Sequence, residues 1–265
     1  MDTGRQGAPY NMALEKVLLA ARANGTAPDT LHFLEFRPCV LLGYGQSVAD
    51  EVNEDYCQSH GIEINRRVSG GGCIYLDGGT LGWELIAKKN SPGIPGNLEA
   101  MYRELCGAVA VALSGFGISA SYRPLNDVEV GGRKISGTGG SELDDSFIFH
   151  GTVLVDFDAD TMTKALKRPH KKAADTKAAE LGVRTICMRE LLGFAPPIPE
   201  VKGRLAGAFA ETLGIGFERG GLYPEEMEML DAELPLFGAR EWVYGSREYM
   251  SAVVSGGGRA EARKS

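Results

Sequence analysis

The stretch INRRVSGGGCIYLDGGT, residues 64–80, places two arginines and three consecutive glycines between two segments that alternate like β-strands. A tight turn needs one or two glycines, so three in succession after Ser69 indicate backbone that lies very close to another group. Successive glycine N–H groups can converge on an anion, and arginine adds a planar fork of donors. A flexible hairpin with solvated arginines has the same pattern. The stretch is therefore either an anion cradle or a simple turn.

Hydrophobic periodicity around this stretch predicts strands and helices in a mixed order, without regular βαβ alternation. This order favours a mixed-sheet α/β or α+β domain over a doubly wound one. Two hairpins are expected, around Gly78-Gly79 and Gly131-Gly132, because the residues on both sides alternate with a period near two. Further strands are expected over 30–36, 39–45, 62–68 and 146–157, and helices over 10–23, 53–61, 97–115, 159–181, 198–213 and 223–233.

The bulk composition is that of an ordinary globular protein, apart from 36 glycines in 265 residues, roughly twice the usual share of about 7%. A net charge of −7 argues against a nucleic-acid partner, and no apolar run approaches the roughly 20 residues that cross a bilayer. The five cysteines are scattered without a CxxC pair. Together with the lack of a signal peptide, these features predict a cytoplasmic protein with reduced thiols and no membrane partner.

A second stretch, LNDVEVGGRKISGTGG at residues 125–140, combines acidic, amide and basic groups. Asn126 and Asp127 open a strand with an oxygen-rich pair that suits hydrated magnesium beside phosphates. Lys134 lies on the returning strand, and the small residues after it leave its ammonium room to reach a ligand. The alternative is a solvent-facing lysine opposite an ordinary turn.

A third stretch, FIFHGTVLVDFD at residues 147–158, is an apolar strand interrupted by His150, Gly151 and Thr152. A histidine in such a strand is either a ligand contact or a structural residue with satisfied hydrogen bonds. Neither a Walker-type phosphate loop nor a dinucleotide-binding GxGxxG accompanies the triple glycine, so kinase-like and Rossmann-type phosphate binding explain the pattern poorly.

Taken together, the motifs RRVSGGGCIYLD, NDVEVGGRKISG and HGTVLVD resemble, in order and spacing, the lipoate–protein ligase A branch of the biotin/lipoate ligase superfamily. The segments NMALEKVL, VLLGYGQSVADEVN and EWVYGS are also similar to their counterparts there, so the resemblance covers about residues 2 to 245. It implies the class II synthetase-like catalytic fold of that superfamily, a mixed and largely antiparallel sheet flanked by helices.

The resemblance implies an enzyme that activates lipoate or octanoate with ATP and Mg²⁺ to an acyl-AMP such as lipoyl-AMP. The acyl group then passes to a lysine of an apo lipoyl-domain protein. Lys134 would be catalytic, bridging the reacting carbonyl oxygen and the phosphate, while Asn126 and Asp127 would hold the metal and nucleotide. The acyl-adenylate would be bound by Arg67, Ser69, Gly70, Gly71, Gly72, Tyr75, Ile135, Gly137, His150, Gly151 and Thr152.

Three departures from the family pattern carry expectations of their own. Leu76 stands where many members have a histidine, and Ser141 stands where related ligases often have a basic residue. The chain is expected to be a single catalytic domain over 1–250 with a disordered tail over 251–265, without the C-terminal accessory domain of longer ligases. A separate accessory subunit is therefore a possible partner. The start of the chain close to its first helix suggests that the initial strand of the family is missing.

Two other functions remain open. Octanoyltransferases of the same fold take the acyl group from a carrier protein through a cysteine thioester, and their cysteine falls where this chain has Asn126 and Asp127. Cys73 and Cys187 remain candidate nucleophiles, although packing is their more common role. A non-catalytic lipoyl-assembly subunit is the other alternative. A biotin ligase is disfavoured, because its Gly-Arg-Gly-Arg type of loop is absent. The sequence leaves open the acceptor domain, the choice between lipoate and octanoate, and the oligomeric state.

Overall fold

The computed structural model describes residues 1–124, 126–167 and 184–255. Its centre is a seven-stranded sheet in the order β1-β2-β6-β10-β9-β8-β7, in which only the β1–β2 pair is parallel. This confirms the expected mixed, largely antiparallel sheet. The strands are β1 (Asp2–Gln6), β2 (Thr30–Phe36), β6 (Thr80–Lys88), β10 (Ser146–Leu154), β9 (Arg133–Leu143), β8 (Asp127–Val130) and β7 (Ser121–Arg123).

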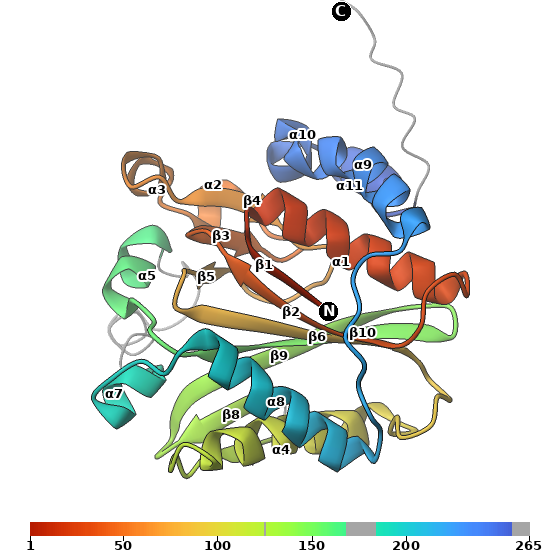
Figure 1. Ribbon diagram of the computed structural model, residues 1–265. Coiled ribbons are helices and arrows are strands. Elements are labelled where there is room, and N and C mark those ends of the chain that lie inside the picture. The colour runs from red at the N-terminus through yellow and green to blue at the C-terminus, as the bar shows by residue number, and fades with distance from the viewer. Residues whose placement is uncertain (125, 168–183, 256–265) are drawn as a thin grey trace, which may run out of the picture.

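Helices cover both faces of this sheet (Figure 1). On one face α1 (Ala8–Ala23) lies against β6 and β10, and α9 (Pro224–Gly238) packs on α1. On the other face α4 (Leu98–Ser114) and α8 (Ile198–Leu213) pack against each other. The chain ends in two further helices beside α9, which are α10 (Arg240–Tyr244) and α11 (Arg247–Val254).

A second, three-stranded sheet carries the stretch around the triple glycine. In it β3 (Cys39–Leu42) pairs in parallel with β4 (Glu63–Arg66) and antiparallel with β5 (Ile74–Leu76). The triple glycine connects β4 to β5, so it links the two outer strands across β3. Short helices flank these strands: α2 (Val48–Glu51), α3 (Glu54–Ser59) and α5 (Ala159–Ala165). A further short helix, α7 (Met188–Leu192), packs on the α4–α8 side of the large sheet.

Two apolar clusters build the core, one on each side of the large sheet. The first joins α1, the small sheet and the C-terminal helices, and includes the fully buried Trp242. The second lies between the large sheet and the α4–α8 pair, and includes the fully buried Trp83. The clean alternation along β6 and β10 distributes side chains to both clusters, as a sheet covered on both faces requires.

Several helix predictions are confirmed together with the local signals behind them. Asn97 accepts a hydrogen bond from the amide of Ala100 and so caps α4, and Asn53 caps α3 in the same way through Tyr56. Gly214, in the left-handed conformation, ends α8. The Gly131-Gly132 hairpin is also confirmed, with both glycines at positive φ.

The predicted hairpin at Gly78-Gly79 is wrong. The strands before and after it belong to different sheets, because β5 pairs with β3 whereas β6 pairs with β2 and β10. Gly79 explains the change of sheet: a Cβ there would lie 1.8 Å from the carbonyl oxygen of Asp156, so the chain passes directly against that backbone. The glycine pair serves a close approach between segments instead of a two-residue turn.

Other boundaries also differ from expectation. The initial strand expected to be missing is present as β1, and α9 continues through Pro235 to Gly238. The tail expected to be disordered from residue 251 is helical through Val254, whose neighbour Val253 is buried. Of the helix expected over 159–181, α5 accounts for the first part, and 168–183 lie outside the described residues, as do 256–265.

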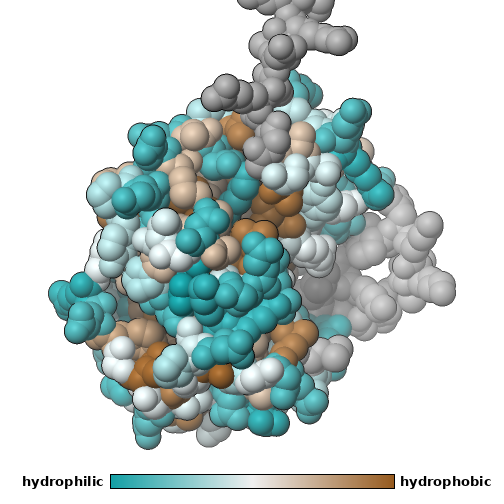
Figure 2. All heavy atoms as spheres, turned by 90° about the vertical axis from the view of Figure 1, so that its right-hand side faces the viewer, coloured by the Kyte–Doolittle hydropathy of each residue, from teal (hydrophilic) through white to brown (hydrophobic). Residues whose placement is uncertain are grey.

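Within the described ranges, every helix is too short or too polar to cross a lipid bilayer. Figure 2 shows one face of the molecule, on which hydrophilic groups predominate and apolar ones form separate patches.

Candidate active site

Arg67 organises the glycine loop through its backbone. Its guanidinium, almost fully buried, donates hydrogen bonds to the carbonyl oxygens of Leu41, Gly70 and Gly72 at 3.0, 3.1 and 2.8 Å. The loop carbonyls therefore turn inward. Among the described residues, nothing accepts a hydrogen bond from the amide groups of Gly70, Gly71 or Gly72, and all three glycines are exposed. These donors are free to bind an anion.

The loop conformation requires glycine at two positions, residue 71 within the loop and residue 43 beside it. Gly71 has a φ of +96°, and a Cβ on Gly43 would lie 2.1 Å from the Gly71 carbonyl oxygen. Beside them Ser69 is buried, and its hydroxyl has no hydrogen-bond partner, although its carbonyl accepts from the amide of Tyr44. An unsatisfied buried hydroxyl beside free amides adds one more donor to the same loop.

Lys134 forms the cationic centre of the second stretch. Its Nζ lies 2.6 Å from Oδ1 of Asp127, an ion pair whose geometry is not that of a hydrogen bond. The lysine side chain runs over Gly137, where an added Cβ would lie 2.5 Å from both Cε and Nζ. It is 39% exposed, so the ammonium remains accessible. The missing side chain of Gly137 therefore leaves the space that Lys134 occupies.

Asn126 and Asp127 fit a magnesium ion only in part. The amide nitrogen of Asn126 donates to the carbonyl of Thr138, which leaves its side-chain oxygen facing away from that bond. The pair offers one carboxylate and one amide oxygen, and the carboxylate already pairs with Lys134. Mg²⁺ commonly keeps several waters and binds through one or two carboxylates plus phosphate oxygens. The two residues therefore suit an ion that arrives with a nucleotide.

His150 lies on the same face of the sheet as Lys134. Its ring sits over Gly139, 3.1 Å from the position of an added Cβ, and Gly139 is two residues beyond Gly137 on β9. Its Nδ1 is 3.6 Å from Oε1 of Glu15 on α1, so this is the α1 face. Burial lowers the pKa of His150, although Glu15 opposes the shift. Lys134 thus lies over Gly137, and the imidazole of His150 lies over Gly139.

Four other residues expected to bind the acyl-adenylate have a less direct relation to this face of the sheet. The side chain of Ile135 is fully buried in the cluster with α4 and α8, so only its backbone can reach the α1 face. A Cβ added to Gly151 would lie 2.4 Å from the ring of Trp83, so packing against this ring requires a glycine. Thr152 accepts a 3.5 Å hydrogen bond from the amide of Gly137. Tyr75 is buried in the small sheet, and burial raises its pKa.

The thiols do not have the surroundings of an activated nucleophile. Burial raises the pKa of Cys73 to about 12 and that of Cys57 and Cys106 to about 11. It also raises the pKa of the fully buried Cys39. Cys187 is buried as well, with Sγ 3.8 Å from a carboxylate oxygen of Glu190. Reactive thiols need a lowered pKa and access to solvent.

Sequence reasoning missed a buried polar group next to His150. Glu15 and Glu84 are 2% and 3% exposed, and Nδ1 of His32 contacts Oε2 of Glu84 at 2.9 Å. Each of these residues interrupts an apolar pattern: Glu15 on the buried stripe of α1, His32 in β2 and Glu84 in β6. A charged residue on a buried face was the available signal.

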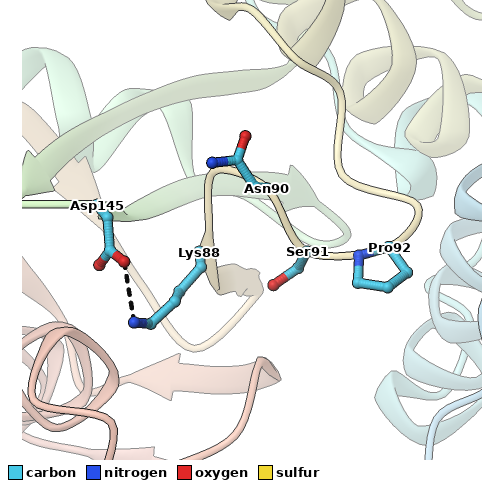
Figure 3. Close-up of a pocket in the computed structure, with 5 residues that line it drawn as sticks. All are labelled: Lys88, Asn90, Ser91, Pro92 and Asp145. Carbon is cyan, nitrogen blue, oxygen red and sulfur yellow. Dashed lines mark hydrogen bonds and ion pairs between the residues drawn. The ribbon is translucent and has the colours of Figure 1, made fainter.

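A separate pocket of about 270 Å³ is lined by Lys88, Asn90, Ser91, Pro92 and Asp145, with an ion pair of 2.9 Å between Lys88 and Asp145 (Figure 3). It contains none of the expected site residues. Four of its five lining residues are charged or polar, whereas a site for an acyl chain is lined mainly by apolar side chains. The better candidate is the sheet face with Lys134 and His150, together with the glycine loop, whose Arg67 acts on the charge of His150.

Known proteins resemble this chain over most of its length. Residues 8–210 match the family described as the lipoyl protein ligase A/B catalytic domain. The octanoyltransferase LipM of Kyrpidia tusciae is 26% identical over 267 residues, covering 92% of this chain and 97% of its own. The lipoate-protein ligase A subunit 1 of Thermoplasma acidophilum is 29% identical over 247 residues, covering 89% and 91%.

Solved structures share the fold. A lipoate-protein ligase A bound with ATP has a TM-score of 0.77 at 23% identity, over 91% of this chain and 96% of its own. The bipartite lipoate protein ligase of Thermoplasma acidophilum also reaches 0.77, at 26% identity, over 91% and 95%. With the family match spanning most of the chain, this protein belongs to the lipoyl protein ligase A/B catalytic domain family.

Proposed function

We propose that this protein transfers a lipoyl or octanoyl group to a lysine of a lipoyl-domain protein, and that it uses an acyl-adenylate as the donor. The observation that carries the proposal is the ammonium of Lys134, held over Gly137 on the sheet face that also bears His150. The relatives, which are named octanoyltransferases and lipoate ligases, support the acyl-transfer part.

Charge explains how these residues would act. A carboxylate attacking the α-phosphate of ATP brings two anions together, and fixed donors must offset their repulsion. The free amides of Gly70 to Gly72 would bind the phosphate, and Lys134 would bridge that phosphate and the acyl carbonyl oxygen. When the acceptor lysine attacks, the carbonyl oxygen gains charge, which the same ammonium stabilises. Asn126 and Asp127 would hold Mg²⁺, which supplies further positive charge beside the phosphates.

The surroundings of the cysteines favour an adenylate over a thioester as the donor. A cysteine route needs a thiolate, and four of the five cysteines have a raised pKa, while Cys187 is buried. Transfer from an adenylate needs only cationic and neutral donors, which the Lys134 site has. This contrast favours the adenylate.

Octanoyl transfer from an acyl-carrier protein is the second candidate. It is favoured by the LipM relatives, such as the one that covers 92% of this chain. In that reaction Cys73, which follows the glycine loop and is half-buried, would be the cysteine to test first. A non-catalytic subunit is a third reading. We further propose that the chain acts as a single catalytic domain, and that adenylation itself uses a separate accessory subunit, as the bipartite archaeal ligase suggests.

The test is a mass assay with three donors. The protein is incubated with an apo lipoyl domain and with octanoate plus Mg-ATP, with preformed octanoyl-AMP, or with octanoyl-acyl-carrier protein. We expect the acceptor to gain one octanoyl mass from octanoyl-AMP, whether or not free octanoate and ATP suffice. Gain only from the carrier protein would replace the proposal with the transferase, and no gain from any donor would leave the non-catalytic reading.

A further inference from the structure

Three ligand-type side chains from different elements meet beneath α1. Glu15 of α1, Glu84 of β6 and His150 of β10 each present one ligand atom, and these atoms all lie within 4.8 Å of one another. Both carboxyl groups are almost completely buried. Two buried carboxyl groups facing one imidazole are costly to desolvate unless something with positive charge or protons joins them.

One atom of this cluster lacks a partner. Oε1 of Glu15 is buried and has no hydrogen-bond partner, although it faces Nδ1 of His150 at 3.6 Å. That separation is too long for a hydrogen bond. It is close to the roughly 3.4 Å between two ligands bound at about 2.1 Å around a tetrahedral ion. The spacing therefore suits an ion between the two groups better than a direct contact.

Glu84 has an outer partner that orients it. Nδ1 of His32 contacts Oε2 of Glu84 at 2.9 Å, and Nε2 of His32 contacts the hydroxyl of Thr3 at 2.8 Å. Burial lowers the pKa of His32 to about 3, so this ring is neutral. We assign the tautomer from these contacts: Nδ1–H donates to Glu84, and Nε2 accepts from Thr3. Such outer hydrogen bonds fix the orientation of metal ligands.

Arg67, the cation next to this cluster, does not take the place of an ion. Its positive charge acts on both Glu15 and His150, but its guanidinium donates hydrogen bonds to backbone carbonyls of the glycine loop and β3. Burial raises the pKa of Glu15 and that of Glu84.

We propose that Glu15, Glu84 and His150 bind a divalent first-row transition metal ion, with zinc as the best match. Two carboxylates and one imidazole suit zinc or manganese, whereas magnesium and calcium prefer all-oxygen ligand sets. The His150 side chain is 20% exposed, which gives an ion a route in and leaves a position for water or another ligand. This site shares no residue with Asn126 and Asp127, so it is independent of the nucleotide magnesium.

The test titrates metal into the chelator-stripped full-length protein. We expect one equivalent of Zn²⁺ to bind with at least micromolar affinity in competition with a chromophoric chelator, and to raise the melting temperature. Co²⁺ in its place should give the visible absorption of a low-symmetry site without the intense thiolate band. Mg²⁺ should leave the melting temperature unchanged.

Variants assign the ligands. Glu15→Gln, Glu84→Gln and His150→Gln should each weaken Zn²⁺ binding at least tenfold, and Glu84→Gln keeps an acceptor for His32. Circular dichroism checks that each variant folds. Matched controls should bind like wild type: Asp127→Asn removes the carboxylate paired with Lys134, and His60→Gln removes an exposed imidazole.

Three results would overturn the site. They are an affinity weaker than micromolar for Zn²⁺, Mn²⁺ and Co²⁺, one-equivalent binding that survives in each of the three ligand variants, and a thiolate band in the Co²⁺ spectrum that Cys73→Ser abolishes. None of these measurements depends on acyl transfer, so the proposed enzymatic function stands or fails separately.

Discussion

Arg66 and Arg67 are adjacent in sequence and differ in what they hold. Arg67 binds the carbonyls of the glycine loop, while Arg66 donates to the carbonyls of Gly43, Tyr44 and Gln46 and of Trp242 and Val243. The sequence singled out this pair and suggested that an arginine fork meets the anion. The guanidinium of Arg67 instead donates to backbone carbonyls, so we propose that the glycine amides would bind the anion.

At the same scale, Lys134→Ala tests the catalytic cation. We expect acyl transfer from octanoyl-AMP to fall by a factor of about 10² to 10³, the usual cost of removing one charge-stabilising donor. Stability should change by less than about 1 kcal/mol, since the Lys134–Asp127 pair is partly exposed. Mass spectrometry measures the rate and urea unfolding measures the stability. Near-wild-type transfer would remove Lys134 from the mechanism.

Cys73→Ser tests the thioester route. With a pKa of about 12, only about one thiol in ten thousand is ionised at pH 8. We expect slow alkylation by iodoacetamide in the native protein and unchanged transfer from octanoyl-AMP in the variant. Rapid alkylation of Cys73 in the folded protein, or loss of transfer in Cys73→Ser, would favour the cysteine mechanism.

At the scale of elements, β9 positions Lys134 because Gly137 leaves room for the lysine side chain to lie over the strand. Gly137→Ala should displace the Lys134 side chain, whose Nζ lies 2.5 Å from the added Cβ, and the flexible lysine can move without unfolding the strand. We expect transfer from octanoyl-AMP to fall at least tenfold with little change in melting temperature.

The matched control for β9 is Gly203→Ala on α8, where an added Cβ meets nothing within 4 Å. It should leave transfer unchanged and stabilise the helix by about 0.5–1 kcal/mol. Equal activity in Gly137→Ala and Gly203→Ala would contradict the placement of Lys134.

Arg66 joins two elements that are far apart in sequence. Arg66→Ala leaves five carbonyls of the loop after β3 and of α10 without their donor, so we expect a loss of at least about 3 kcal/mol in the free energy of unfolding. Arg103→Ala, which removes an exposed arginine beside Glu104, should change it by less than about 0.5 kcal/mol. Equal losses in urea titrations would refute the role of Arg66.

Helix caps and hydrophobic periodicity predicted the elements whose boundaries depend on local sequence. α4 and α8 follow their caps and apolar stripes, and β2 coincides with TLHFLEF. The Gly78-Gly79 hairpin failed because period-two alternation on both sides does not say which strand pairs with which. β1 was missed because DTGRQ has no apolar alternation, and its strand conformation depends on parallel pairing with β2. Glu15, Glu84 and His150 meet only through the tertiary fold.

At the scale of the whole molecule, the two apolar clusters share one sheet, so they should unfold together. The protein has two tryptophans, and each reports on one cluster: Trp83 on the α4–α8 side and Trp242 on the α1 side. We expect the fluorescence transition of Trp83→Phe and that of Trp242→Phe each to coincide with the variant's own circular dichroism transition. Separate midpoints within one variant would divide the chain into two folding units.

The carbonyls gathered by Arg66 have a consequence for how the protein is made. Three of them come from residues 43–46 and two from α10, near the other end of the sequence. While the chain is still being synthesised, β3 and β4 leave the ribosome long before α10. Arg66 therefore lacks its two acceptors in α10 until translation is almost complete, and a nascent chain stalled before residue 242 should be unable to complete the packing of β4 beside the glycine loop.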